Sequence, residues 1–162
     1  MLEDSVVTNA ARMSLSAARA AIAAAEREAA ERGLAVVVAV VDDGGNLVSF
    51  DRMDRAPLLS LDFAADKAWT AAAFGRATDE WWSDMSTQPA LAATLPQRPR
   101  FVAVGVGVPL WIGDTLVGGV GVSGGSVADD IACAQAGQVA FAGQLPATNG
   151  VPSVTGKGTE KK

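Results

Sequence analysis

Apolar positions in the first part of the chain recur at helical spacing. Residues 15–25 place a leucine, an isoleucine and several alanines on one face, and the turns that follow are rich in Glu and Arg. This periodicity predicts an amphipathic helix. Ser14 or Ser16 is expected to cap its start, and Gly33 is expected to end it.

A different pattern follows directly. Residues 34–42 form a nearly unbroken run of apolar, mainly β-branched side chains, which is typical of a strand covered on both faces. The sequence Asp-Asp-Gly-Gly-Asn then predicts a hairpin turn, and residues 47–52 predict the returning strand. Two strands joined by so short a turn pair antiparallel.

The later elements follow from the same two periodicities. Helical spacing returns over residues 58–76, and a short helix capped by Thr78 is expected in the tryptophan-containing segment after it. Residues 90–99 contain two prolines and predict a loop. Residues 101–123 supply one or two further strands around a Gly-Asp turn, and a last helix is expected over 127–145.

This order of elements predicts an α+β fold. Short turns between neighbouring strands indicate an antiparallel sheet with helices packed on its faces, a sandwich of the profilin or PAS kind. We expect a single domain over residues 1–147 and a flexible tail over 148–162. Alanine- and glycine-rich faces and four tryptophans favour a homo-oligomer.

Composition and charge narrow the possible functions. The chain has 162 residues, a net charge of −5 and one cysteine. The negative charge argues against a nucleic-acid partner, and no apolar stretch is long enough for a membrane helix. We see no basic and then apolar pattern of a signal peptide. A lone cysteine cannot form a disulfide within the chain, so a cytoplasmic protein is expected.

Histidine and tyrosine are both missing from the sequence. Without imidazole, a zinc site of Cys and His ligands and His-dependent catalytic triads are ruled out. The 18 carboxylates leave an oxygen-ligand metal site open, but no EF-hand-like spacing appears, and the expected site contains no metal. Among the usual protein ligands of haem iron, only methionine or Cys133 remains. Acid–base chemistry near neutral pH then falls to a carboxylate, a lysine or the thiol.

Lys67 is the most unusual residue of the second predicted helix. Leu59, Phe63, Thr70 and Phe74 share its face, so Lys67 lies within a largely apolar stripe. A buried lysine loses its charge readily or needs a carboxylate partner. Lys67 is therefore a candidate ligand clamp or general base. Alternatively, its stem covers the core while the ammonium group reaches water or an aspartate.

A cluster of charged residues follows the second predicted strand. Arg52, Met53 and Asp54 lie where this strand passes into a loop, and loops on a rigid scaffold often carry binding residues. Asp129 and Asp130 lie in the first turn of the last predicted helix, where they also complement the helix dipole. Local Asp–Arg pairing on the surface is the alternative for the first group.

The glycines before the last helix have the G-x-G-x-x-G spacing of a dinucleotide-binding loop. Only one helix and a polar segment follow, with no second buried strand, so a dinucleotide-binding βαβ unit is not expected. Backbone N–H groups near Ser123, Gly124 and Gly125 would suit a carboxylate. The other interpretation is a tight turn from a strand into a helix.

Two long blocks of sequence carry a resemblance to a known family. The first, within residues 34–74, joins an apolar strand, a D-x-GG-x-L hairpin, the motif F-x-RMD-x-A and a helix with KA-x-TA. The second, residues 107–137, contains VG-x-x-GVSG, an acidic pair and CA-x-AG. Together these blocks resemble the GlcG/HbpS-like family, which includes domains fused to corrinoid adenosyltransferases.

The resemblance implies a five-stranded antiparallel sheet flanked by helices, assembled into dimers or larger rings. Some members bind or degrade haem, and one branch resembles lyases that act on hydroxylaminobenzoate. Because this chain lacks histidine, we expect no cofactor and a lyase or isomerase acting on a small aromatic carboxylate. Haem binding or degradation and a non-catalytic sensing or assembly module are the alternatives.

The substrate is expected between the Arg-Met-Asp turn, the second helix and the glycine turn. The expected site residues are, as catalytic groups, Lys67, Asp54, Asp129 and Asp130, and, as ligand-binding groups, Arg52, Met53, Ser123, Gly124 and Gly125.

Overall fold

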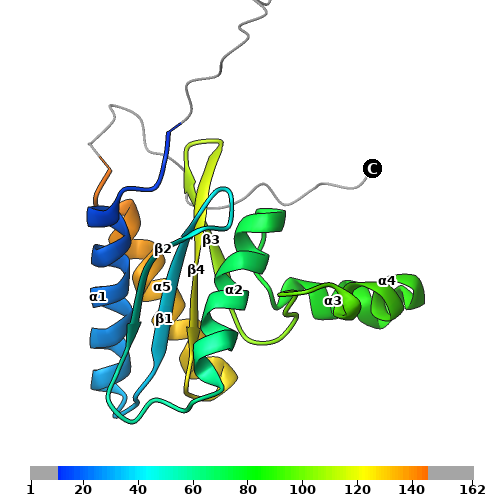
Figure 1. The fold of residues 1–162 in the computed structure, drawn as a ribbon, viewed down its shortest axis with the longest axis horizontal. Helices are drawn as coiled ribbons and strands as arrows, with labels where there is room; N and C mark the ends of the chain where they lie inside the picture. Colours follow the sequence, from blue (N-terminus) through cyan, green and yellow to red (C-terminus); the bar gives the residue numbers. More distant parts are fainter. Residues whose placement is uncertain (1–10, 146–162) are drawn as a thin grey trace, which may run out of the picture.

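The computed structural model describes residues 11–145, and the expected domain limit at residue 147 and the tail over 148–162 lie outside them. The fold is α+β, as the sequence predicts. Its strands pair antiparallel in one sheet of order β2-β1-β4-β3 (Figure 1). The strands are β1 (Val37–Asp42), β2 (Leu47–Arg52), β3 (Gly107–Ile112) and β4 (Thr115–Ser123).

Helices cover both faces of this sheet: two lie together on one face, and a single helix crosses the other (Figure 1). In the described part of the chain, no helix has the length and apolar character needed to cross a bilayer. The helices are α1 (Leu15–Glu31) and α5 (Val127–Ala142) on the first face, α2 (Ser60–Phe74) on the second, and the short α3 (Glu80–Thr87) and α4 (Pro89–Thr94).

The predicted start and end of the first helix are confirmed. The hydroxyl of Ser14 accepts a hydrogen bond from the Ala17 N–H at 3.2 Å, and Gly33 follows the helix with a φ of +69°. Capping by a serine oxygen satisfies one of the backbone donors left free at a helix start. A positive φ is the conformation in which glycine commonly ends a helix.

The sheet has four strands within residues 11–145, one fewer than the five expected. Residues 101–106 are irregular because threonine side chains, instead of a neighbouring strand, satisfy backbone groups there. The Thr70 hydroxyl accepts from the Val102 N–H at 3.1 Å, and the Thr78 hydroxyl donates to the Gly105 carbonyl at 2.7 Å. Thr78 therefore does not cap α3, as the sequence suggested, but fixes the segment before β3.

The segment 90–99 is largely helical, so the prediction of a loop was wrong. It contains most of α4 and a 3-10 turn over Leu95–Gln97. Both elements have a proline in their first two positions, where the missing N–H has no intrahelical partner to lose. The prolines therefore start these turns instead of preventing them.

Helix α2 packs closely on the sheet because the strands beneath it carry glycine. A Cβ atom built on Gly107 would lie 2.1 Å from the carbonyl oxygen of Lys67, and one on Gly121 would lie 2.1 Å from that of Ala64. A Cβ on Gly119 would likewise lie 2.4 Å from the carbonyl oxygen of Ala68. Two of the three glycines of the G-x-G-x-x-G spacing thus serve helix–sheet packing.

Helices α3 and α4 extend away from the body of the molecule (Figure 1). Trp81 attaches α3, because its ring packs edge-on against Phe74 at 4.6 Å and Phe101 at 5.7 Å between centroids. The guanidinium group of Arg76 lies over the same ring, 4.4 Å from its centroid. Trp82, in contrast, is largely exposed.

Candidate functional site

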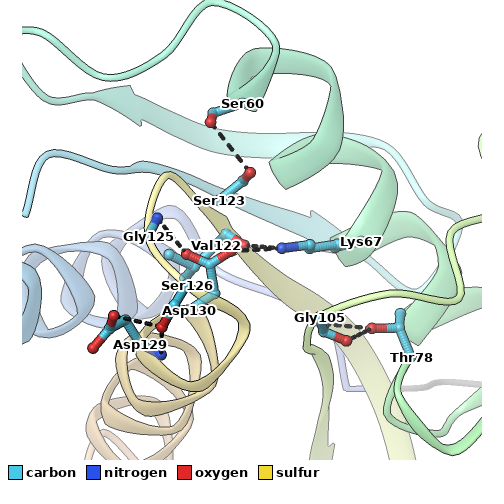
Figure 2. Close-up of polar contacts among 11 residues, drawn as sticks. Ser60, Lys67, Thr78, Gly105, Val122, Ser123, Gly125, Ser126, Asp129 and Asp130 are labelled. Carbon is cyan, nitrogen blue, oxygen red and sulfur yellow. Dashed lines mark hydrogen bonds and ion pairs between the residues drawn. The ribbon is translucent and has the colours of Figure 1, made fainter.

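Lys67 and Asp130 form a buried ion pair between α2 and α5. The Lys67 Nζ atom lies 2.9 Å from Asp130 Oδ2, and the two side chains are 4% and 6% exposed. The same amine donates to the Val122 carbonyl at the end of β4, at 2.7 Å (Figure 2). The apolar stripe around Lys67 therefore places its charge inside the protein, against a carboxylate and a backbone dipole.

Asp130 is held in place by a second hydrogen bond. Its Oδ1 atom accepts from the Gly125 N–H at 2.9 Å, while Oδ2 faces Lys67 (Figure 2). The carboxylate thus bridges the glycine turn and α2. Gly125 was expected to offer its N–H to a ligand, and in the structure this N–H serves Asp130.

The glycine turn depends on residues without side chains. Gly124 has a φ of +149°, which favours glycine, and a Cβ at this position would lie 2.6 Å from the Ala35 carbonyl oxygen. Gly124 lets the chain pass close to the segment before β1 on its way into α5. The interpretation of these glycines as a tight strand-to-helix turn agrees with this geometry.

Two serine hydroxyls lie near the ion pair. Ser60 at the start of α2 and Ser123 at the end of β4 are both buried, and their Oγ atoms lie 3.2 Å apart (Figure 2). Each hydroxyl can donate and accept, so this pair can turn a donor toward a ligand without losing its mutual contact.

A pocket of about 320 Å³ brings these groups together; we call it the candidate pocket. Lys67, Asp130, Ser60 and Ser123 supply its polar groups, and the glycine turn forms part of its wall. The apolar part of its lining is formed by Pro57, Leu59, Phe63, Val104 and Val127.

The apolar groups at this pocket are accessible to solvent. Leu59 is 66% exposed, Val104 51% and Val127 50%. A neighbouring pocket of about 470 Å³ shares Val104 and Val127 with the candidate pocket and is bounded on its other side by Trp82. The arrangement combines a charged, buried floor with an apolar entrance.

Asp129, next to Asp130, lies outside the candidate pocket. Its Oδ1 atom pairs with Arg32 at 3.2 Å, and its Oδ2 atom accepts from the Ser126 hydroxyl at 2.6 Å. The Ser126 hydrogen bond and then the Arg32 guanidinium lower the pKa of Asp129 below its ordinary value. Asp129 therefore stays ionised and links the start of α5 to the end of α1.

The Arg-Met-Asp turn also lies apart from Lys67. Arg52 is exposed and donates to the Ala56 carbonyl at 3.2 Å. Met53 and Asp54 line a different pocket, against α1, where the Met53 sulfur accepts from the Val36 N–H at 3.5 Å. Of the nine expected site residues, the candidate pocket collects five, namely Lys67, Ser123, Gly124, Gly125 and Asp130.

The model of the family described as "Haem degrading protein HbpS-like" matches residues 13–138 of this chain. This match covers more than three quarters of the 162 residues. The chain belongs to the HbpS-like family.

Relatives of known sequence agree with this assignment. A 15.0 kDa protein encoded between dhaT and dhaS of Citrobacter freundii is 36% identical over 121 residues, which is 74% of this chain and 85% of that protein. GlcG of Escherichia coli is 34% identical over 106 residues, or 65% and 77% of the two chains. The corrinoid adenosyltransferase PduO of Salmonella typhimurium is 40% identical, but the match spans 69% of this chain and only 34% of PduO.

Solved structures of HbpS-like proteins share the fold. ORFY of Klebsiella pneumoniae superimposes with a TM-score of 0.81 at 34% identity, covering 88% of this chain and 98% of ORFY. A double mutant of HbpS from Streptomyces reticuli gives 0.76 at 31% identity, covering 86% and 93%. A complex of PduOC with haem gives 0.74 at 34% identity, covering 80% and 95%.

The donor groups of this HbpS-like chain do not fit a haem iron at the two pockets. Haem iron is usually held by His, Cys, Met or Tyr, and the residues that line either pocket include none of these types. Met53 faces α1, and Cys133 is fully buried in the core on the α1 and α5 side of the sheet. Within residues 11–145, no three His, Cys, Asp or Glu side chains are grouped to hold a metal ion.

Several residues of the candidate pocket in this HbpS-like chain were not predicted from the sequence. Ser60 lies two helical turns before Lys67, and Val104 and Gly105 lie in an apolar run almost forty residues after it. Only the packing of the 101–106 segment against α2 brings them to the pocket. The pairing of Lys67 specifically with Asp130 also had no sequence signal, because Asp54, Asp129 and Asp130 were all candidates for the site.

Proposed function

We propose that this chain binds a small aromatic carboxylate in the candidate pocket and acts on it as a cofactor-independent lyase or isomerase. The observation that carries the proposal is the Lys67–Asp130 pair, which is buried yet lines a pocket open to solvent. Buried ion pairs cost desolvation energy and often stabilise a fold no better than apolar side chains do. A buried pair at the floor of a pocket therefore favours a chemical role.

The size of the candidate pocket supports a small ligand. A volume of about 320 Å³ is at the lower end of ligand pockets and suits a single-ring molecule of the hydroxylaminobenzoate type. Phe63 and the exposed Leu59 offer apolar contacts to a ring. The Ser60 and Ser123 hydroxyls can supply hydrogen bonds to a carboxylate, and the Lys67–Asp130 pair lies beside them.

Proton transfer is the chemistry that these residues support. Asp130 Oδ2 lies 2.9 Å from Lys67 Nζ, a separation within the reach that general acid–base catalysis needs. The pair can accept a proton from a bound substrate and return it at another atom. Lyase and isomerase reactions both need such a transfer.

Binding is tested by the shift in melting temperature that benzoate or hydroxylaminobenzoate produces, since a ligand of the folded state raises this temperature. Leu59→Ala removes an exposed leucine from the pocket and is expected to weaken binding roughly fivefold. Leu47→Ala removes a similarly exposed leucine from β2, outside the pocket, and is expected to leave binding unchanged. Equal effects of the two substitutions would contradict the proposed site.

Haem binding is the second candidate function, favoured by the relatives HbpS and PduOC. The adjoining pocket, with Val104, Val127 and the exposed Trp82, offers apolar surface to a flat molecule. A hemin titration followed by its Soret band tests this candidate, with the Met53→Ala, Cys133→Ala double variant as control. A saturable shift that the double variant loses would identify a sulfur ligand, although neither of these pockets is lined by methionine or cysteine.

Assembly into a homo-oligomer stays a prediction. Light scattering coupled to size-exclusion chromatography gives the subunit count directly.

A further inference from the structure

We infer that Lys67 is a nucleophile that forms an imine with the carbonyl group of its substrate, so that the substrate class is a small carboxylate bearing an aldehyde or ketone. This inference rests on the proposed binding of a small carboxylate in the candidate pocket. It goes further, because it assigns a covalent step to one atom, Lys67 Nζ.

The geometry around the Lys67 amine leaves one of its donors without a partner within residues 11–145. An ammonium group has three N–H donors, and two of them are used, by Asp130 at 2.9 Å and by the Val122 carbonyl at 2.7 Å. No partner for the third donor is seen among the described residues. Gly105 passes beside this atom, and a Cβ there would lie only 2.7 Å from Nζ. Only a residue without a side chain fits at this position, and both Gly105 and Lys67 line the candidate pocket.

The residue type at position 67 is unusual for this chain. Nine of the 13 basic residues are arginine, and Lys67 is the single lysine before Lys157. An arginine satisfies a carboxylate with two parallel hydrogen bonds and suits a structural ion pair at least as well. A guanidinium group stays protonated and does not act as an amine nucleophile, whereas a buried lysine can. The one buried cation of the pocket is thus the type that permits covalent chemistry.

Asp130 lies where imine formation at Lys67 needs a proton carrier. Asp130 takes a proton from the Lys67 ammonium group, and the neutral amine adds to the carbonyl carbon to give a carbinolamine. The protonated carboxyl group then returns its proton to the carbinolamine oxygen, which leaves as water while the C=N bond forms. The net change is ammonium plus carbonyl to iminium plus water. Asp130 ends as a carboxylate beside the iminium charge, 2.9 Å from its nitrogen position.

An iminium group explains how such a pocket works without a cofactor. The cationic C=N bond withdraws electrons from the neighbouring carbon, so that a bond to that carbon breaks more easily than in the parent carbonyl compound. Loss of a proton there leads to isomerisation, and loss of a carbon group leads to a lyase reaction.

Reductive trapping tests the inference on the full chain. The protein is incubated with para-formylbenzoate and sodium cyanoborohydride, which converts an iminium into a stable secondary amine, and its peptides are mapped by mass spectrometry. We expect Lys67 to gain the mass of the aldehyde less one oxygen. Its labelling is expected to exceed that of Lys157, Lys161 or Lys162 by roughly tenfold, because the pocket concentrates the aldehyde beside Nζ. Benzoate, which lacks the carbonyl, is expected to compete.

Three variants serve as controls. Lys67→Arg keeps the charge and is expected to abolish the pocket adduct while tail labelling continues. Asp130→Asn is expected to slow trapping, whereas Asp129→Asn, one residue away and paired to Arg32, is expected to leave it unchanged. The wild-type peptide map decides the question even where a variant fails to fold.

The outcomes separate this inference from the proposed function. If benzoate binds and Leu59→Ala weakens it, but Lys67 is not labelled above the tail lysines, the imine is overturned and the carboxylate site stands. If benzoate and hydroxylaminobenzoate also fail to bind, the proposed function is overturned as well.

Discussion

Asp129 and Asp130 are neighbours at the start of α5, yet their ion pairs have opposite surroundings. Asp129 meets Arg32 at the surface, with 30% and 38% of the two side chains exposed. Asp130 meets Lys67 with both side chains almost completely buried. Successive residues of a helix point about 100° apart, so one turns toward water and the other toward the sheet and α2. Two aspartates at the same helix end therefore have different roles. Asp129 interacts with the helix dipole and with a surface arginine, whereas Asp130 forms part of the candidate pocket.

The largest effect is expected from Asp130→Ala. Removal of this carboxylate leaves the Lys67 charge buried without its partner, and loss of one member of a buried pair costs about 3–5 kcal/mol. The free energy of unfolding from urea denaturation measures this loss. Adding Lys67→Met to Asp130→Ala is expected to recover part of it, because the unpaired charge is gone. Additive losses would contradict direct coupling between the two side chains.

Gly121→Ala tests whether the close packing of α2 on the sheet, which buries the Lys67–Asp130 pair, contributes to stability. A Cβ at Gly121 would lie 2.1 Å from the Ala64 carbonyl oxygen, so α2 must move off the sheet. Overpacking of this kind costs about 1–3 kcal/mol. Gly143→Ala is the matched control, because the nearest atom to its Cβ would be 3.5 Å away and its φ is −68°. Urea denaturation measures the free energy of unfolding of both variants. Equal values for Gly121→Ala and Gly143→Ala would show that stability does not depend on the close packing of α2 on the sheet.

The surface pair is expected to contribute little. Asp129→Asn should leave the urea midpoint unchanged near neutral pH in high salt, where exposed charges are screened. The pKa of Asp129 is lowered in the folded state, so any stability it supplies is present above the ordinary carboxyl pKa and lost as pH falls through the lowered value. A clear difference in urea midpoint between wild type and Asp129→Asn at neutral pH would show that the surface pair also contributes to stability, as the buried pair of Asp130 is expected to do.

The smallest effect concerns Cys133, one turn further along α5. Burial raises the pKa of its thiol to about 11, so the folded protein is expected to resist iodoacetamide near pH 8 and to react once unfolded. Because the folded-state pKa is raised, the thiol's contribution to stability is complete below the ordinary value of 9.0 and is lost as pH rises through about 11. Mass spectrometry of alkylated protein measures the reaction. Rapid alkylation of the folded protein would show that the Cys133 side of α5 is accessible to iodoacetamide.

The sequence predicted most of the fold because its periodicities are local. Neighbouring residues alone determine the apolar run before Asp42, the Asp-Gly-Gly turn and the pattern over Leu47–Arg52. Strand β2 accordingly begins and ends where the sequence predicted. The helix at residues 89–94 was missed because prolines were given more weight than the alanine-rich sequence between them. The extra strand was not found because Thr70 and Thr78 satisfy backbone groups across long sequence distances.

The candidate site was predictable only in part. Lys67 stood out because a charge within an apolar stripe is a local contradiction, and Asp130 was a candidate because of its place in a helix start. Which aspartate faces Lys67 depends on the helix rotation of α5 and on its distance from α2, and neither follows from local sequence. The positions of Arg52 and Asp54 could not be predicted for the same reason. The local sequence does not determine toward which face of the sheet the charged residues after a strand will lie.

The sheet order has a consequence for how the molecule is made. β1 occupies the interior of the sheet, and its partner β4 lies far along the chain: Asp42 pairs with Gly118, and Val37 with Ser123. During synthesis from the N-terminus, the β1–β2 hairpin emerges long before β4 can cover its open edge. Its valine-rich strand then offers unpaired N–H and C=O groups to any other chain nearby. Such distant pairing also slows folding. The nascent chain therefore passes through a period of aggregation risk that ends only when β4 has left the ribosome.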